Sequence, residues 1–328
     1  MTALRKTFSK FAQHRPLRIA ALLLGVLFAV AAPPRAADAG DKTIRVGYQK
    51  YGTLILVKSK GALEEKLKPL GYDVTWSEFA SGPALLEALN AGAIDVGTTG
   101  ETPPIISQAA GVDLVYVANE PASPRGEAIL VPKTSAIKTV ADLKGKKVAL
   151  NKGSNVHYLL VRALEAAGLA YTDIQTVFLA PADARAAFER GAVDAWVIWD
   201  PFLAAAEAAT GARTLTTGEG LVPNHQFYLA TGKYSTQSPQ AVDAFVEAIA
   251  EVDRWADKNP GAVAEVVSPL TGIPAPVLAA ALQRQSYGVQ PIDEKVLAEQ
   301  QKIADAFLAL GLIPKPIVIA DAVRKPRS

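Results

Sequence analysis

The order of strands and helices repeats along this chain, and this repeat constrains the fold more than any other feature. Buried apolar strands alternate with helices up to Gly92-Ala-Ile-Asp, which precedes a helix beginning near Pro103. The same order returns and ends at Gly191-Ala-Val-Asp, 99 residues later, before a helix that opens at Trp199-Asp200-Pro201. Alternating strands and helices form mainly parallel sheets covered by helices. We therefore predict an α/β fold with two similar lobes.

Apolar periodicity and turn residues predict the individual elements. Strands are predicted at 43–48, 73–79, 93–98, 112–117, 127–131, 147–151, 174–179, 193–198 and 225–231. Helices are predicted at 54–68 and 156–167, from Ser81, from Pro103 and from Pro181, and in a C-terminal tail at 241–258, 262–267, 275–284 and 293–310.

The strand at 225–231 follows the second repeat and is expected to return to the first lobe. Residues 40–131 would then form the first part of lobe 1, residues 132–223 lobe 2, and residues 224–328 the return to lobe 1 and a helical tail packing on it. We expect the chain to cross between the lobes twice, near Val131-Pro132 and near 222–224. Two crossings are what a hinge between two lobes requires.

Residues 1–39 are expected to be a signal peptide. Five basic residues, the last of them Arg18, lie at the start. An apolar run follows at 19–32, and Ala37-Asp38-Ala39 offers a cleavage site. The alternative is a membrane anchor, but the apolar run is shorter than the ~20 residues that a spanning helix needs.

The charge balance changes once this segment is removed. Six of the 34 basic residues and one of the 32 acidic residues lie in it, so 28 basic and 31 acidic residues remain. The basicity therefore belongs to export and does not indicate nucleic-acid binding. The chain has no Cys, and so no disulfide and no site for a lipid anchor. A periplasmic protein without a lipid anchor fits these features.

The stretch 88–104 runs from a helix end through a buried strand directly into the next helix. Gly100, Glu101 and Thr102 form the corner before Pro103 and Pro104. Proline is favourable at the start of a helix, where its missing N–H has no intrahelical partner. The unpaired N–H groups and the positive end of the helix dipole there form an anion site.

Hydroxyl, amide and aromatic side chains gather at the predicted strand ends, with few basic groups. The candidate ligand-binding residues are Gln49, Ser81, Gly82, Gly100, Glu101 and Thr102 in the first lobe, Ser154, Asn155, His157, Trp199 and Asp200 in the second, and Tyr228 on the returning strand. Carboxylate sites often use a bidentate Arg clamp. This set instead suits a compact tetrahedral oxyanion held by oriented dipoles. The rings of Trp199 and Tyr228 would cover the organic part of the ligand.

Several of these residues also have a purely structural interpretation. Ser81 and Ser154 could serve only as helix caps. His157 could be a surface or capping residue, and Trp196 is expected in the core. Glu101 would repel an anion, so its side chain is expected to point away or to hold a water molecule or an ammonium group.

Enzyme signatures are weak. Only two histidines follow the signal segment, Lys152-Gly153-Ser154 lacks the full phosphate-loop spacing, and no nucleophile elbow is present. We expect no metal and no cofactor. The alternative is an enzyme on the same fold, in which Glu101, Asp200 and His157 act as acid and base.

Ten short motifs together resemble one family, from about residue 43 to the C-terminus. They are VGYQK at 46–50, LEALN at 86–90, TGETPP at 99–104, QAAG at 108–111, LVYV at 114–117, IKTVADLKG at 137–145, PADARAAF at 181–188, VDAW at 193–196, IWDP at 198–201 and FYLA at 227–230. They resemble the aliphatic sulfonate-binding proteins of ABC importers.

The resemblance implies a type II periplasmic binding protein that closes two lobes on an anionic organosulfonate and delivers it to an ABC permease with its ATPase. By match of motif, it implies ligand contacts from Gln49, Ser81, Gly82, Gly100, Thr102, Ser154, His157, Trp199, Asp200 and Tyr228. We expect a monomer without nucleic-acid partners. Taurine, nitrate or a thiamine precursor are alternative ligands, and a sensor that presents its ligand to a membrane receptor is an alternative role.

Overall fold

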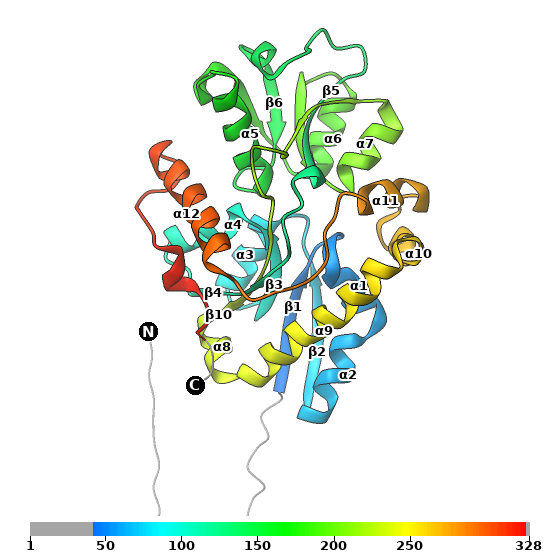
Figure 1. Ribbon diagram of the computed structural model, residues 1–328, viewed down its shortest axis with the longest axis vertical. Helices are drawn as coiled ribbons and strands as arrows, with labels where there is room; N and C mark the ends of the chain where they lie inside the picture. The colour runs from blue at the N-terminus through cyan, green and yellow to red at the C-terminus, as the bar shows by residue number, and fades with distance from the viewer. Residues whose placement is uncertain (1–41, 326–328) are drawn as a thin grey trace, which may run out of the picture. The chain divides into compact units, whose positions relative to one another are not determined.

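The computed structural model describes residues 42–325, so the predicted signal peptide lies outside the described residues. Two five-stranded sheets form the centres of two lobes (Figure 1). The strands of the first sheet, in spatial order, are β2 (Tyr72–Glu78), β1 (Lys42–Tyr48), β3 (Val96–Gly100), β10 (Gln226–Thr231) and β4 (Leu114–Asn119). β1 runs parallel to β2 and β3, and β10 is antiparallel to both of its neighbours.

The second sheet repeats this topology strand for strand. Its order is β7 (Gln175–Phe178), β6 (Lys147–Leu150), β8 (Ala195–Trp199), β5 (Glu127–Val131) and β9 (Arg213–Thr217). Here β6 is parallel to β7 and β8, and β5 is antiparallel to β8 and β9. The predicted duplication and the predicted two α/β lobes with mainly parallel sheets are confirmed.

Helices cover both sheets. Those of the first repeat are α1 (Gly52–Lys60), α2 (Ala62–Leu67), α3 (Gly82–Asn90) and α4 (Thr102–Ala109); those of the second are α5 (Asn155–Ala166), α6 (Pro181–Glu189) and α7 (Phe202–Thr210). The tail contains α8 (Gly232–Gln237), α9 (Pro239–Lys258), α10 (Pro260–Thr271), α11 (Ala275–Leu282) and α12 (Glu294–Ala309). Short 3-10 turns are η1 (Lys68–Leu70), η2 (Pro124–Gly126), η3 (Val140–Leu143), η4 (Tyr171–Asp173) and η5 (Ile319–Ala322).

One predicted helix is divided in two. The expected helix at 54–68 ends at Gly61, whose φ of 66° is left-handed and whose N–H caps the carbonyls of Val57 and Lys58. Glycine adopts this conformation without the steric penalty of a Cβ atom. The chain then begins α2 at Ala62.

The first crossing between the lobes lies earlier than predicted. β5 pairs with β8 and β9, so the chain leaves the first sheet after β4 and crosses at 120–126, not near Val131-Pro132. All five residues of β5 are buried, and such an apolar run does not indicate which sheet it joins. The second crossing, at 218–225, includes the predicted 222–224.

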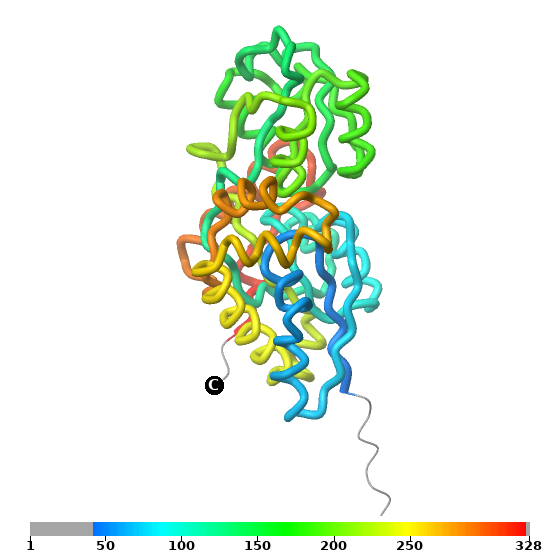
Figure 2. The backbone as a smooth tube through the Cα atoms, turned by 90° about the vertical axis from the view of Figure 1, so that its right-hand side faces the viewer, coloured from blue at the N-terminus to red at the C-terminus, as the bar shows by residue number. Residues whose placement is uncertain are grey.

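The tail packs on the first lobe and also reaches the second. α9 lies along α1 and α2, and it buries Val242, Phe245, Ile249 and Val252, spaced as one face of a helix requires. α12 contacts α4, whereas α11 contacts α7 of the second lobe. Figure 2 shows the gold and orange segment with α10 and α11 directly beneath the green lobe.

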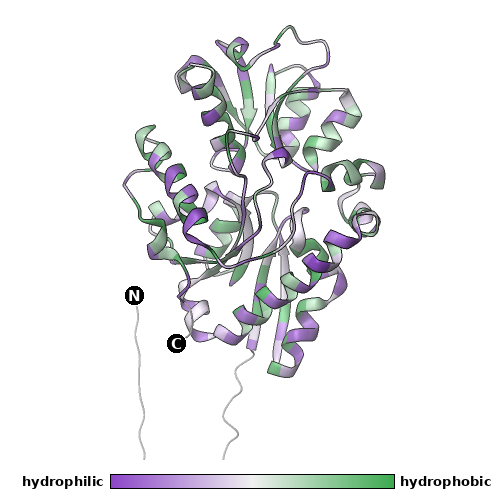
Figure 3. Cartoon of the chain, viewed as in Figure 1, coloured by the Kyte–Doolittle hydropathy of each residue, from purple (hydrophilic) through white to green (hydrophobic). Residues whose placement is uncertain are grey.

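Apolar residues gather on the central strands and on the inner faces of the helices, where Figure 3 is green. The outward faces of α9 and α12 are largely purple. Within residues 42–325, no helix is both long enough and apolar enough to cross a membrane.

Candidate functional site

A pocket lies between the two lobes and contains about 540 Å³ of space, part of it open to solvent. The first lobe contributes Tyr51 and Gly100 to its lining, the first crossing contributes Glu120 and Gly126, and the second lobe contributes Asn155, Trp199 and Asp200. The second crossing contributes Asn224 and His225, and the tail contributes Arg284. Four of the predicted ligand residues therefore line one pocket: Gly100, Asn155, Trp199 and Asp200.

Two strand-to-helix corners face each other across this pocket. Gly100 ends β3 before α4, and Asn155 is the first residue of α5. A Cβ atom added to Gly100 would lie 2.9 Å from the Cβ atom of Asn155, closer than two carbon atoms tolerate. The close approach of the two lobes at this point therefore depends on glycine.

Asn155 also joins the second lobe to the second crossing. Its Nδ2 donates to Oε2 of Glu127 at 2.5 Å and to Oδ1 of Asn224 at 3.1 Å. Asn155 was predicted as a ligand residue from its position at a helix start. The structure gives its amide two protein partners as well.

Trp199 carries a buried hydrogen-bond donor without a partner. The residue is 5% exposed, and its Nε1 has no hydrogen-bond partner. Its ring packs edge-to-face with Phe202, with centroids 6.2 Å apart. A buried N–H without a partner is unfavourable, so this group is ready to donate to a ligand oxygen. Trp196, by contrast, is 1% exposed within the core, as predicted.

Glu101 and Thr102 form the start of α4 and are both fully buried, but neither lines the pocket. The Oγ1 of Thr102 has no partner. Oε2 of Glu101 accepts the N–H of His225 at 3.0 Å, and its Oε1 has no partner. Burial, and then the nearby charge of Glu127, raise the pKa of Glu101 well above its ordinary value.

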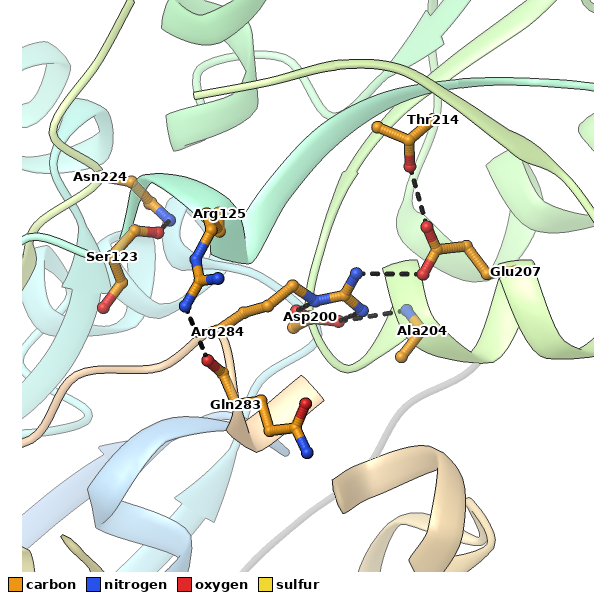
Figure 4. Close-up of polar contacts among 9 residues, drawn as sticks. All are labelled: Ser123, Arg125, Asp200, Ala204, Glu207, Thr214, Asn224, Gln283 and Arg284. Carbon is orange, nitrogen blue, oxygen red and sulfur yellow. Dashed lines mark hydrogen bonds and ion pairs between the residues drawn. The ribbon is translucent and has the colours of Figure 1, made fainter. Parts of the chain in front are cut away.

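Asp200 is held by Arg284, a residue that no sequence motif marks. Arg284 donates from Nε and Nη2 to the two oxygens of Asp200 at 2.8 and 3.1 Å, and from Nη1 to Glu207 at 3.0 Å (Figure 4). Oδ1 of Asp200 also accepts the N–H of Ala204 at 3.1 Å. Burial outweighs the arginine and raises the pKa of Asp200 to about 6.

Arg284 follows α11 in the tail, away from every predicted strand end, so no motif drew attention to it. The nearby Arg125, at the first crossing, donates from Nη2 to the carbonyl of Gln283 at 3.1 Å (Figure 4). Both arginines thus connect the tail to other parts of the chain.

Three further predicted residues are buried outside the pocket lining and use their polar atoms within the protein. Nε2 of Gln49 donates to the carbonyl of Thr98 at 3.1 Å. The hydroxyl of Ser154 donates to the carbonyl of Asn151 at 2.8 Å. The hydroxyl of Tyr228 donates to Glu120 at 2.6 Å, and its ring is fully buried.

Ser81 and Gly82 stand at the start of α3. Ser81 occupies the N-cap position, is 5% exposed and makes no side-chain capping bond. A Cβ atom on Gly82 would lie 2.8 Å from Cγ of Pro103, so α3 and α4 start side by side.

His157 is wedged among aromatic rings rather than placed in the pocket. Its ring centroid lies 5.4 Å from that of Phe307 in α12, and Tyr171 and Phe178 pack nearby. Its Nδ1 accepts the N–H of Gly153, so Nε2 carries the proton and donates to the hydroxyl of Tyr171 at 2.8 Å. Burial, with the charge of Lys152, lowers its pKa to about 4.

Among residues 42–325, no group of three or more His, Cys, Asp or Glu side chains could hold a metal ion. What the pocket offers is a set of hydrogen-bond donors at helix starts and an indole N–H. Its one arginine already engages two carboxylates. This arrangement can bind a small anion with an organic substituent.

Residues 37–271 match the NMT1-like family. A protein of Escherichia coli K12, named for binding aliphatic sulfonates, is 44% identical over 94% of this chain and 96% of its own length. Among solved structures, the alkanesulfonate-binding protein SsuA of Xanthomonas axonopodis pv. citri, bound to MOPS, is 41% identical. It covers 87% of this chain and 98% of its own, with a TM-score of 0.83.

The periplasmic aliphatic sulphonate-binding protein SsuA of Escherichia coli is similar as well. It is 44% identical, covers 87% of this chain and 93% of its own, and gives a TM-score of 0.79. The match extends over nearly all of the described residues, including the tail that carries Arg284. The chain therefore belongs to the NMT1-like family and is closely related in sequence and fold to these aliphatic sulfonate-binding proteins.

Proposed function

We propose that this protein is a periplasmic solute-binding protein that captures aliphatic sulfonates and delivers them to an ABC permease with its ATPase. The observation that carries the proposal is that Trp199 lines the interlobe pocket and that its buried Nε1–H has no partner within the protein. The names of the similar proteins support the choice of ligand.

The chemistry of a sulfonate matches this pocket. Its three oxygens share one negative charge and accept hydrogen bonds in a tetrahedral arrangement. The start of α5 supplies backbone N–H groups, and the starts of both α4 and α5 supply the positive ends of helix dipoles. Trp199 and Tyr51 supply aromatic surface for the organic part. Of the predicted ligand residues, those proposed to contact the sulfonate are the four that line the pocket, Gly100, Asn155, Trp199 and Asp200. The eight that do not line it stay predictions: Gln49, Ser81, Gly82, Glu101, Thr102, Ser154, His157 and Tyr228.

Titration calorimetry with methane-, butane- and octanesulfonate, taurine, nitrate and sulfate tests the proposal. We expect binding of alkanesulfonates and weaker or no binding of the inorganic anions. Tight binding of nitrate or of a neutral heterocycle, with no sulfonate bound, would reject it. Taurine in the same series separates a taurine-binding protein from a general sulfonate-binding protein.

Replacing Trp199 by Phe keeps the ring and removes its N–H. A hydrogen bond to a charged group contributes about 1.5–3 kcal/mol, so we expect sulfonate affinity to fall at least about tenfold. Trp76→Phe is the matched control, because the N–H of Trp76 donates to Glu64 at 2.7 Å, outside the pocket. Equal affinities of the wild type and Trp199→Phe for the sulfonate would show that the indole N–H does not bind the ligand.

The proposal includes no catalysis, export by residues 1–39, no lipid anchor and a monomer. Sulfonate recovered chemically unchanged after prolonged incubation would agree with capture, and turnover would contradict it. Secretion of the full chain, with loss of its first residues, would agree with export. Its mass in solution would test the monomer.

A further inference from the structure

Two carboxyl groups from opposite lobes are buried together without a Lys or Arg partner among residues 42–325. Glu101 stands at the start of α4 in the first lobe, and Glu127 opens β5 in the second. Both residues are 0% exposed, and Oε1 of each has no hydrogen-bond partner. Gly100 packs against Asn155, whose amide donates to Glu127, so the two acids lie on either side of one lobe contact.

The groups around Glu101 do not neutralise it. Its carboxylate accepts backbone N–H groups of Asn224 and His225, while Gln300 of α12 donates to its carbonyl. The other titratable groups that face it are Glu299 of α12 and Tyr158 of α5, neither of them a cation. The His225 imidazole is engaged elsewhere, by the carbonyl of Glu120 and by Glu299 at 3.0 Å.

Glu127 has equally little compensation. Asn155 donates to its Oε2, and Tyr51, from the loop before α1, is the titratable group that faces it besides Glu101. Among residues 42–325, no Lys or Arg forms an ion pair with either carboxyl. Two carboxylates in one water-free region repel each other, and a proton relieves both the repulsion and the cost of burial.

Burial is the first cause that raises the pKa of both groups, and the charge of Glu127 raises that of Glu101 further. We propose that Glu101 and Glu127 together hold one proton when the lobes are closed, so that closure on a sulfonate takes up a proton from solution. The proposal rests on the proposed sulfonate binding.

The link to closure follows from where the two acids are attached. The chain between the lobes consists of the crossings at 120–126 and 218–225, and a rotation about them separates Gly100 from Asn155. Separation moves Glu101 away from Glu127 and from Tyr158, the two groups of the second lobe that face it. Both acids then ionise, and the proton is released.

The direction of the pH effect is fixed by this scheme. The bound form holds more protons than the free form, so affinity falls as pH rises, by up to about tenfold per pH unit for one proton. Sulfonates stay ionised throughout the usable pH range. A pH dependence of binding therefore reports on the protein.

Calorimetry of the full mature chain, with methane-, butane- or octanesulfonate at pH 7 in buffers of different ionisation enthalpy, measures the proton uptake directly. We expect the apparent binding enthalpy to vary with the buffer, with a slope that shows uptake of up to one proton. Binding with no buffer dependence would overturn the proposal and leave sulfonate capture intact. No binding by any sulfonate would instead overturn the proposed function.

The variant Glu127→Gln tests whether the proton is held by this pair. Glutamine cannot ionise, but it keeps an oxygen that accepts the hydrogen bond from the Asn155 amide. We expect binding to persist, the proton uptake to disappear and the pH dependence of the affinity to flatten. Asp253→Asn is the matched control. Asp253 is 1% exposed and its pKa is also raised by burial, but its partners Thr53, Glu120 and Val289 do not belong to the second lobe. Uptake that survives in Glu127→Gln, or vanishes equally in Asp253→Asn, would contradict the assignment.

Discussion

At the scale of single residues, the lobes are brought together by the absence of a side chain. Gly100 has no Cβ atom, and the side chain of Asn155 fills that space from the other lobe. The backbone of Gly100 is not left-handed, so glycine is required here because of space and not because of conformation. The opposed corners can therefore be separated by one methyl group.

Gly100→Ala is expected to hold the lobes slightly apart. Overpacking of this kind costs about 1–3 kcal/mol, which here falls on the closed form, so sulfonate affinity should drop at least about fivefold. Gly261→Ala is the control, since a Cβ atom there meets nothing within 4 Å. Unchanged affinity in Gly100→Ala, measured by calorimetry, would show that the contact is not part of closure.

Because the imidazole of His157 is buried, we predict that the stability of the protein depends on pH. The pKa of this imidazole is lowered to about 4 in the folded protein, so the unfolded chain binds more protons between pH 6.5 and 4. Stability should therefore fall as pH decreases through this window, by at most about 3 kcal/mol from this group. Urea unfolding of the wild type and His157→Gln at pH 7 and pH 4.5 measures the difference. Identical losses in both proteins would contradict a buried neutral imidazole.

The place of a residue in the site could be predicted from the sequence where the residue lies at the end of a strand. It could not be predicted where the residue is buried by a partner that is distant in the sequence. Gly100, Asn155 and Trp199 lie at three different strand ends or helix starts, which local apolar and turn patterns predict. All three line the pocket. Burial of Tyr228 against Glu120 and of His157 against Phe307 depends on residues that are distant in the sequence. No local pattern contains that information.

At the scale of elements, α11 and α12 both connect the tail to the second lobe: Phe307 of α12 packs on His157 of α5, and the end of α11 makes the charged contacts. α11 contacts α7, and Arg284, just after α11, pairs with Asp200 and Glu207 of the second lobe. The pairs are largely shielded from solvent, with exposed side-chain fractions of 19% for Arg284 and 14% for Asp200. Shielded charge pairs are screened less than exposed ones, so they can contribute to closure.

Arg284→Gln should weaken closure by leaving Asp200 and Glu207 without a counter-charge. We expect sulfonate affinity to fall about tenfold, as loss of one charge-assisted hydrogen-bonded pair predicts. Arg162→Gln is the control, because its pair with Glu165 is exposed and lies within one helix. Calorimetry on both variants checks the difference. An equal effect of the two changes would argue against a connection through α11.

The elements themselves were largely predictable, because apolar period and turn residues are local signals. The predicted strand at 127–131 matches β5 residue for residue, but its predicted assignment to the first lobe was wrong, because β5 belongs to the second sheet. Its pairing depends on β8 and β9, which lie far along the chain. The strand β9 was missed, since Arg213–Thr217 is polar and only partly buried.

At the scale of the whole molecule, each lobe completes its sheet with a strand that follows a crossing. β5 enters the second sheet after 120–126, and β10 enters the first after 218–225. The crossings are also bonded to each other: Ser123 donates its N–H to Pro223, and Gly218 donates its N–H to Pro124. A paired connection of this kind favours rotation about one axis over independent movement of the lobes.

The central claim is that helix starts and an indole N–H hold a sulfonate between the lobes with little help from free positive charge. A crystal structure of the protein with bound butanesulfonate tests it most directly. We predict sulfonate oxygens within hydrogen-bond distance of backbone N–H groups at the start of α5 and of Nε1 of Trp199, next to the Gly100 corner, with Arg284 still bound to Asp200 and Glu207. A sulfonate paired mainly with Arg284 or a lysine, or bound outside this pocket, would contradict the account.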